Sequence, residues 1–84
     1  MTADYFTAKI RTAVLSDPPN TDKALGHSRL LGALIQRSHA EDERIGHAFS
    51  MLQWQLQVLG TDLFDMARLS KALEALEVFT RERK

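Results

Sequence analysis

The sequence predicts an all-α protein, a small bundle of four helices or of three helices preceded by a short N-terminal helix. Two observations predict this fold class. Apolar residues recur at helical spacing along most of the chain, and no stretch combines period-two alternation with β-branched residues. The adjacent Pro18 and Pro19 are the only prolines and mark one clear break. Because 84 residues suffice for one small domain, we expect residues 1–84 to form a single helical domain.

The first predicted helix covers residues 3–15. Phe6, Ile10 and Val14 recur every fourth residue, so they share one face of a helix. Thr2 is the expected N-cap, because its hydroxyl can accept a hydrogen bond from the first turn. The two prolines then separate this short helix from the rest of the chain.

The second predicted helix covers residues 22–37. Thr21 is its expected N-cap, and Asp22 places a negative charge in the first turn, where the helix dipole favours it. Gly26 and Gly32 each weaken the helix by up to about 1 kcal/mol relative to Ala. The sequence therefore leaves open whether this helix is continuous or breaks near Gly26. Its inner face carries Ala24, His27, Leu31, Leu34 and Ile35.

The third predicted helix covers residues 39–59. Ser38 followed by Glu41 matches a capping box, which favours a new helix start directly after Ser38. A long apolar stripe follows, and Gly60 is the expected C-terminal cap. The stripe consists of Ile45, Ala48, Phe49, Leu52, Leu56 and Leu59.

The fourth predicted helix covers residues 62–81. Thr61 and Asp62 are expected to restart the helical pattern immediately after Gly60. Met66, Leu69, Leu73 and Leu76 then follow at 3-4-3 spacing, which is typical of an amphipathic helix. Because the connection is short, the last two helices should form an antiparallel hairpin.

The third helix is unusual because it is apolar on two sides. Met51, Trp54 and Val58 form a second group about 130° away from the main stripe, and residues 45–61 carry no formal charge. Either another helix of the chain covers this second face, or a second copy or a partner protein does. A chain this short without cysteine has a limited core and no disulfide, which favours a partner. We therefore expect a homodimer whose interface comprises Ser50, Met51, Trp54, Gln57 and Val58.

Three residues are candidates for a metal site. His39, Glu43 and His47 recur every fourth residue and would share one side of a straight helix. The pair His39 and Glu43 resembles the His-x-x-x-Glu of hemerythrin-like di-iron bundles. Such a bundle needs ligands from several helices, and the chain has neither Glu-x-x-His nor a second His-x-x-x-Glu. We therefore interpret these residues as solvated, and expect no metal and no cofactor.

Composition excludes several other classes of function. The chain has 11 Lys+Arg and 11 Asp+Glu, so it lacks the basic excess with which nucleic-acid binders attract phosphates. It has no cysteine, no phosphate-binding glycine loop and no recognisable pairing of a nucleophile with a base. No apolar stretch is long enough to span a membrane, and no signal peptide is recognised. We expect a cytoplasmic protein that is not an enzyme.

The function predicted from the sequence is protein interaction. We expect an adaptor, an inhibitor or regulator of a larger protein, or an assembly subunit, which acts through the second apolar face of the third helix. The alternative is a helical bundle that binds a small ligand or a metal. An exposed apolar patch would favour the first interpretation, and an enclosed pocket with converging polar groups would favour the second.

Overall fold

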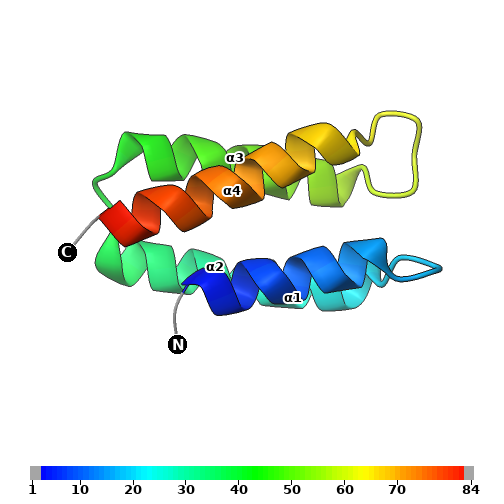
Figure 1. Cartoon of the computed structure of the whole chain (residues 1–84), viewed down its shortest axis with the longest axis horizontal. Helices are drawn as coiled ribbons and strands as arrows, with labels where there is room; N and C mark the ends of the chain where they lie inside the picture. The colour runs from blue at the N-terminus through cyan, green and yellow to red at the C-terminus, as the bar shows by residue number, and fades with distance from the viewer. Residues whose placement is uncertain (1–2, 83–84) are drawn as a thin grey trace.

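The structure, a computed structural model, describes residues 3–82 and consists of four helices. No strand occurs in this range, so the predicted all-α bundle is confirmed. The helices run alternately in opposite directions (Figure 1). Their bounds are Ala3–Leu15 for α1, Thr21–Ser38 for α2, Glu43–Gln57 for α3 and Met66–Glu82 for α4.

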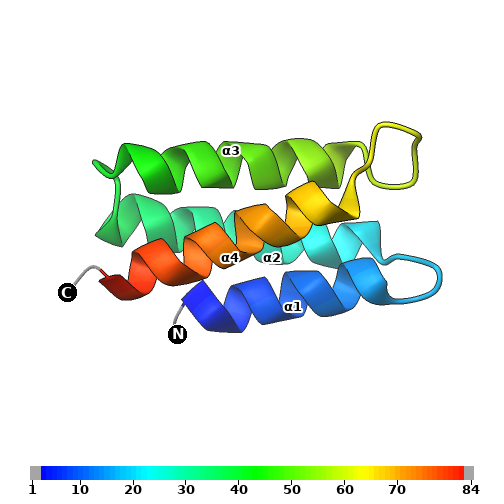
Figure 2. The ribbon, with the colours of Figure 1, turned by 45° about the horizontal axis from the view of Figure 1, so that its top comes forward.

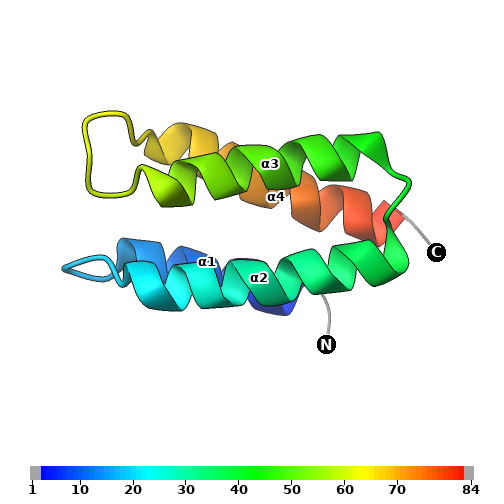
Figure 3. The same ribbon diagram turned by 180° about the vertical axis from the view of Figure 1, so that it is seen from behind.

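The bundle consists of two antiparallel hairpins, α1–α2 and α3–α4, which lie side by side. The closest packing is within each hairpin. Between the hairpins, α1 lies beside α4 and α2 lies beside α3 (Figures 2 and 3). The C-terminal hairpin expected from the sequence is therefore present. Because α1 packs on α4 and α2 packs on α3, the α1–α2 hairpin covers one side of the α3–α4 hairpin, and the other side faces solvent.

The first two helices follow the predicted ranges closely. Helix α1 has the predicted bounds, and its predicted cap, Thr2, lies outside the described residues. Helix α2 is continuous through both of its glycines. Its N-cap is Asn20, whose side-chain oxygen accepts a hydrogen bond of 3.0 Å from the Lys23 amide. The prediction of Thr21 as the cap is wrong because Thr21 already belongs to the helix.

Helix α3 begins four residues later than predicted, at Glu43 instead of residue 39. Its N-cap is Asp42, whose carboxylate accepts hydrogen bonds from the amides of Arg44 and Ile45. The predicted capping box from Ser38 to Glu41 does not form, because Ser38 is still the last residue of α2. A short turn therefore separates the two helices where the sequence suggested an immediate restart.

The connection between α3 and α4 is also longer than predicted. Helix α3 ends at Gln57 and its C-cap is Val58, so the prediction of Gly60 as the cap is wrong. Gly60 lies in the following turn, where it adopts a positive φ of 87°. Helix α4 begins at Met66 and not at residue 62. Its first turn is capped by Asp65, whose Oδ1 accepts hydrogen bonds from the amides of Ala67 and Arg68. A carboxylate in this position suits the positive end of the helix dipole.

All four helices contribute to one hydrophobic core. The predicted stripes of the sequence supply it, since each helix turns its apolar face inward. The largest fully buried apolar side chains are Ile10, Leu31, Ile45, Leu52, Leu56, Leu69, Leu73 and Leu76. No helix among the described residues has the length and the hydropathy that crossing a membrane requires.

Candidate binding groove between α3 and α4

The predicted interface residues do not form one continuous exposed face. Trp54 is 51% exposed, and Ser50 and Gln57 are also exposed. Met51 is half-buried, whereas Val58 is 7% exposed and belongs to the interior of the chain. The expectation that Val58 lies on an open surface is therefore wrong. Val58 follows the end of α3 and is covered by residues of its own chain. For this residue, the burial agrees with the interpretation in which the chain itself, and not a partner, covers the second apolar face of the third helix.

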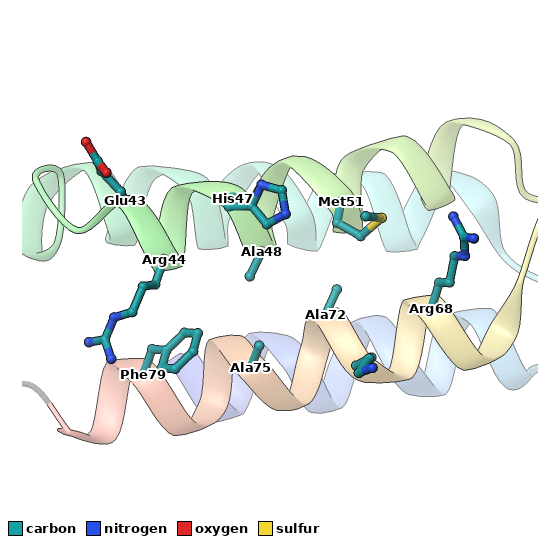
Figure 4. Close-up of a pocket in the computed structure, with 10 residues that line it drawn as sticks. Glu43, Arg44, His47, Ala48, Met51, Arg68, Ala72, Ala75 and Phe79 are labelled. Carbon is teal, nitrogen blue, oxygen red and sulfur yellow. The ribbon is translucent and has the colours of Figure 1, made fainter.

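Met51 instead lines a groove that runs along the outer side of the α3–α4 hairpin (Figure 4). The groove has a volume of about 870 Å³ and is open to solvent. Each helix contributes five residues to the lining of the groove. They are Glu43, Arg44, His47, Ala48 and Met51 from α3, and Arg68, Lys71, Ala72, Ala75 and Phe79 from α4.

Small side chains form the floor of the groove. Ala48 of α3 and Ala72 of α4 are buried, and Ala75 is half-buried one turn further along α4. In the close-up, their methyl groups point into the space between the two helices, with Met51 and Phe79 toward opposite ends (Figure 4). Larger residues at these positions would fill the space between the helices. The alanines therefore leave a hollow that is apolar at its base.

Two cations stand at the end of the groove where α4 begins. Arg68 and Lys71 are both exposed. The Arg68 Nε lies 3.6 Å from Oδ2 of Asp65, in a pair whose side chains are 67% and 49% exposed. Lys71 has no ion pair with any described residue. Exposed pairs of this kind contribute little to stability, so both cations remain accessible to an external anion.

The opposite end of the groove is already occupied by interactions within the chain. The Arg44 guanidinium lies 4.4 Å from the centre of the Phe79 ring, and its Nη2 lies 3.3 Å from Oδ2 of Asp42. The hydrogen bond from the Arg44 side chain is the largest cause that holds the pKa of Asp42 below its ordinary value. Glu43 also lines this end, and in the close-up its carboxylate points away from Phe79 (Figure 4). This end therefore carries both signs of charge.

A smaller hollow continues the surface beyond the cationic end. It has a volume of about 550 Å³ and is lined by Trp54, Gln55, Asp62, Leu63, Phe64, Asp65, Met66 and Arg68. Leu63 is 66% exposed, so it and Trp54 offer apolar surface to solvent. Arg68 lines both hollows and connects them. An extended partner could thus contact the groove and the exposed Trp54 together.

The structure does not bring the three metal candidates onto one helix face. His39 lies outside α3 and forms the C-cap of α2, where its amide donates a hydrogen bond of 2.6 Å to the Ile35 carbonyl. Glu43 and His47 lie on α3 and line the groove. Within residues 3–82, no three His, Asp or Glu side chains are grouped closely enough to hold a metal ion. The three residues do not share one helix face because α3 starts at Glu43 and not at His39 as predicted.

Comparison of the chain with family models, with curated proteins and with solved structures gives no match.

Met51 is the one residue that the predicted interface shares with the lining of this groove, and no residue of its α4 side was predicted. Arg68 and Lys71 belong to the polar side of α4, which a helical wheel assigns to solvent. Ala72 and Ala75 are small residues near the apolar stripe, and they create a hollow only when α3 lies beside them. The available signal was the coincidence of alanines on both helices of the predicted hairpin, at Ala48, Ala72 and Ala75.

Proposed function

We propose that this protein is a non-enzymatic protein-interaction module that binds a helical segment of a partner protein in the α3–α4 groove. The observation that carries the proposal is the shape of the groove, which is open, apolar at its floor and parallel to two helices. Amphipathic helices are commonly recognised by grooves of this kind, into which they place their apolar face.

The dimensions of the groove suit a short helix. Its lining runs from Glu43 to Met51 on α3 and from Arg68 to Phe79 on α4. At 1.5 Å per residue these stretches are roughly 12 and 16 Å long. Two to three turns of a bound helix would cover them. The alanine floor supports close approach, since small residues let a neighbouring backbone come near.

The open form of the groove supports a helix over a small ligand. Sites for small molecules usually enclose most of the surface of the ligand, and here the space between α3 and α4 is uncovered along its length. The sequence-based alternative of a ligand-binding bundle is thus less well supported. The lining also favours binding over chemistry, because alanine, methionine and phenylalanine form its floor and ends.

The charges of the lining favour a different protein over a second copy of this chain. Arg44, Arg68 and Lys71 line the groove, against the single carboxylate of Glu43. A parallel pairing of two copies groove to groove would bring Arg68 and Lys71 of both copies together, and like charges across an interface are unfavourable. The homodimer expected from the sequence is therefore an alternative outcome of the experiment below. The proposal keeps the cytoplasmic location expected from the sequence.

The test is a selection followed by a binding assay. A display library of helical peptides of about 18 residues, each with a leucine stripe and a randomised polar face without Trp or Tyr, is selected on the intact protein. Trp54 is the single tryptophan of the wild-type chain and lies next to the groove, so its fluorescence reports binding to the wild type. Binding to the Trp variants, which contain a second tryptophan, is measured by isothermal titration calorimetry. We expect binders that Ala75→Trp abolishes, because an indole would fill the groove.

The matched control is Ala33→Trp, an equal enlargement at an exposed position of α2. This variant should bind the selected peptides as the wild type does, and circular dichroism checks that both variants fold. A selection that yields no binder, or binders indifferent to Ala75→Trp, would contradict the proposed function. Sedimentation of the protein alone tests the homodimer, which Ala75→Trp should disrupt if copies pair through the groove.

A further inference from the structure

We propose that the helical segment bound in the groove is acidic at one end, where its carboxylates lie over Arg68 and Lys71. This inference rests on the proposed function and specifies the chemistry of the partner. The apolar stripe of the segment packs on the alanine floor, and its acidic end points toward the start of α4.

The two cations are placed to act together. Arg68 and Lys71 are three residues apart on α4, so they are neighbours on one side of the helix. Both line the groove and both are exposed. The only ion pair between them and a described residue is the loose one from Arg68 to Asp65, at 3.6 Å. A carboxylate of a partner can therefore bind here without breaking a buried interaction.

The other end of the groove has no corresponding requirement for an acid. Arg44 stacks on Phe79 and pairs with Asp42, and Glu43 adds a negative charge to the same rim. An acidic side chain placed there would meet the carboxylate of Glu43 and an Arg44 guanidinium that already pairs with Asp42. The difference between the two ends selects one direction for the bound segment, with its acidic residues toward Arg68.

The exposed apolar surface beyond the cations extends the same arrangement. Trp54 and Leu63 border Arg68 on the side away from the alanine floor. A segment that continues past its acidic residues would cover Trp54 with a further apolar residue. The same hollow is also lined by Asp62 and Asp65, so the acidic residues of the segment end at Arg68 and an uncharged apolar residue continues past it.

The experiment compares two peptides with the same leucine stripe and a length of about 18 residues. One carries Glu at the polar positions near the end predicted to contact Arg68, and the other carries Lys there. Both are titrated into the intact protein with Trp54 fluorescence as the readout. We expect the Glu peptide to bind about tenfold more tightly than the Lys peptide, since two favourable pairs replace two repulsive ones.

Charge-reversal variants locate the effect. Arg68→Glu combined with Lys71→Glu should reverse the preference, so that the Lys peptide binds more tightly. Arg29→Glu combined with Arg37→Glu makes the same change of net charge at exposed positions of α2 and should leave the preference intact. Both pairs of substitutions replace exposed side chains, and thermal unfolding by circular dichroism checks that both variants remain folded.

The possible results separate this inference from the proposed function. Peptides that bind wild type equally well, and that Ala75→Trp still excludes, would overturn the charge requirement and leave the groove as a docking site. A preference that the Arg29 and Arg37 variant also reverses would overturn it too, because net charge alone would then explain binding. Failure of both peptides, together with a failed library selection, would reject both proposals. If the protein self-associates through the groove, the occupant of the groove is a second copy of this chain, and the inference of an acidic partner is overturned.

Discussion

A β-carbon added to Gly32 of α2 would lie 2.8 Å from Cζ of Phe49 in α3. This is closer than carbon atoms normally approach, so the absence of a side chain at Gly32 lets the Phe49 ring lie against α2. The contact lies where the two hairpins meet. Gly32 therefore has a packing role that compensates for its low helix propensity.

The first prediction concerns the two glycines of α2. Gly26→Ala should stabilise the protein by up to about 1 kcal/mol, because alanine favours a helix and the new methyl group would meet no atom within 4 Å beyond its chain neighbours and the nearby backbone of α2. Gly32→Ala gains the same propensity but must displace Phe49, at a typical cost of about 1–3 kcal/mol. Urea unfolding of both variants should place Gly32→Ala below Gly26→Ala in stability.

A second substitution checks the cause of this difference. Phe49→Leu removes the ring atoms nearest to Gly32, so it should reduce the penalty of Gly32→Ala in the double variant. Equal stabilisation by both glycine substitutions in the wild-type background would show that Phe49 does not limit the approach of α2 and α3.

The second prediction concerns the contact between α1 and α4. The hydroxyl of Thr7, which is fully buried, donates a hydrogen bond of 2.6 Å to Oε2 of Glu77. Arg11 Nη1 lies 3.3 Å from the same oxygen. Thr7→Val keeps the shape and removes the donor, so thermal or urea unfolding should show a loss of about 1–3 kcal/mol.

Thr12→Val is the matched control for this prediction. The Thr12 hydroxyl is exposed and donates only to the Ala8 carbonyl of its own helix. Its removal should change the free energy of unfolding by less than about 0.5 kcal/mol. A similar effect of both substitutions would mean that the bond to Glu77 adds nothing to the packing of α1 on α4.

The third prediction concerns the pH dependence of stability. The pKa of Asp42 is held below its ordinary value, first by the hydrogen bond from the Arg44 side chain. Because the folded protein favours the charged form, the contribution of Asp42 is present above the ordinary pKa and is lost as the pH falls through the lowered one. Acid should therefore weaken the cap of α3.

Asp42→Asn tests this pH dependence. Asparagine is an equally good N-cap but neither titrates nor forms the ion pair with Arg44. We expect wild type to have the higher melting temperature at about pH 6 and the difference to shrink toward about pH 2. A difference that stays constant over this range would contradict a role for the charge of Asp42.

The helices were predictable because each is marked by local chemistry. The stripe of Phe6, Ile10 and Val14 and the two prolines define α1 without any knowledge of the other helices. The starts of α3 and α4 were missed because several residues competed for each cap. Asp42 caps α3 in place of Ser38, and Asp65 caps α4 in place of Thr61. Which residue becomes the cap depends on the conformation of the connecting turn, and this conformation is set by the packing of the helices on either side.

The groove was only half predictable because it belongs to a pair of helices. Met51 and Trp54 were identified from the periodicity of α3 alone. Val58 was placed with them by the same periodicity, yet it is buried after the end of α3. The roles of Arg68 and Ala75 depend on the rotation of α4 relative to α3, which no periodicity within one helix specifies.

The most direct test of the central claim is amide chemical-shift mapping of the isotope-labelled protein during titration with the Glu peptide. The account predicts saturable shifts at His47, Met51, Lys71 and Ala75, which line the groove, and unchanged signals at Ala33 on α2. Shifts centred on α1 and α2, or no shifts at a peptide concentration that saturates the fluorescence change, would contradict it.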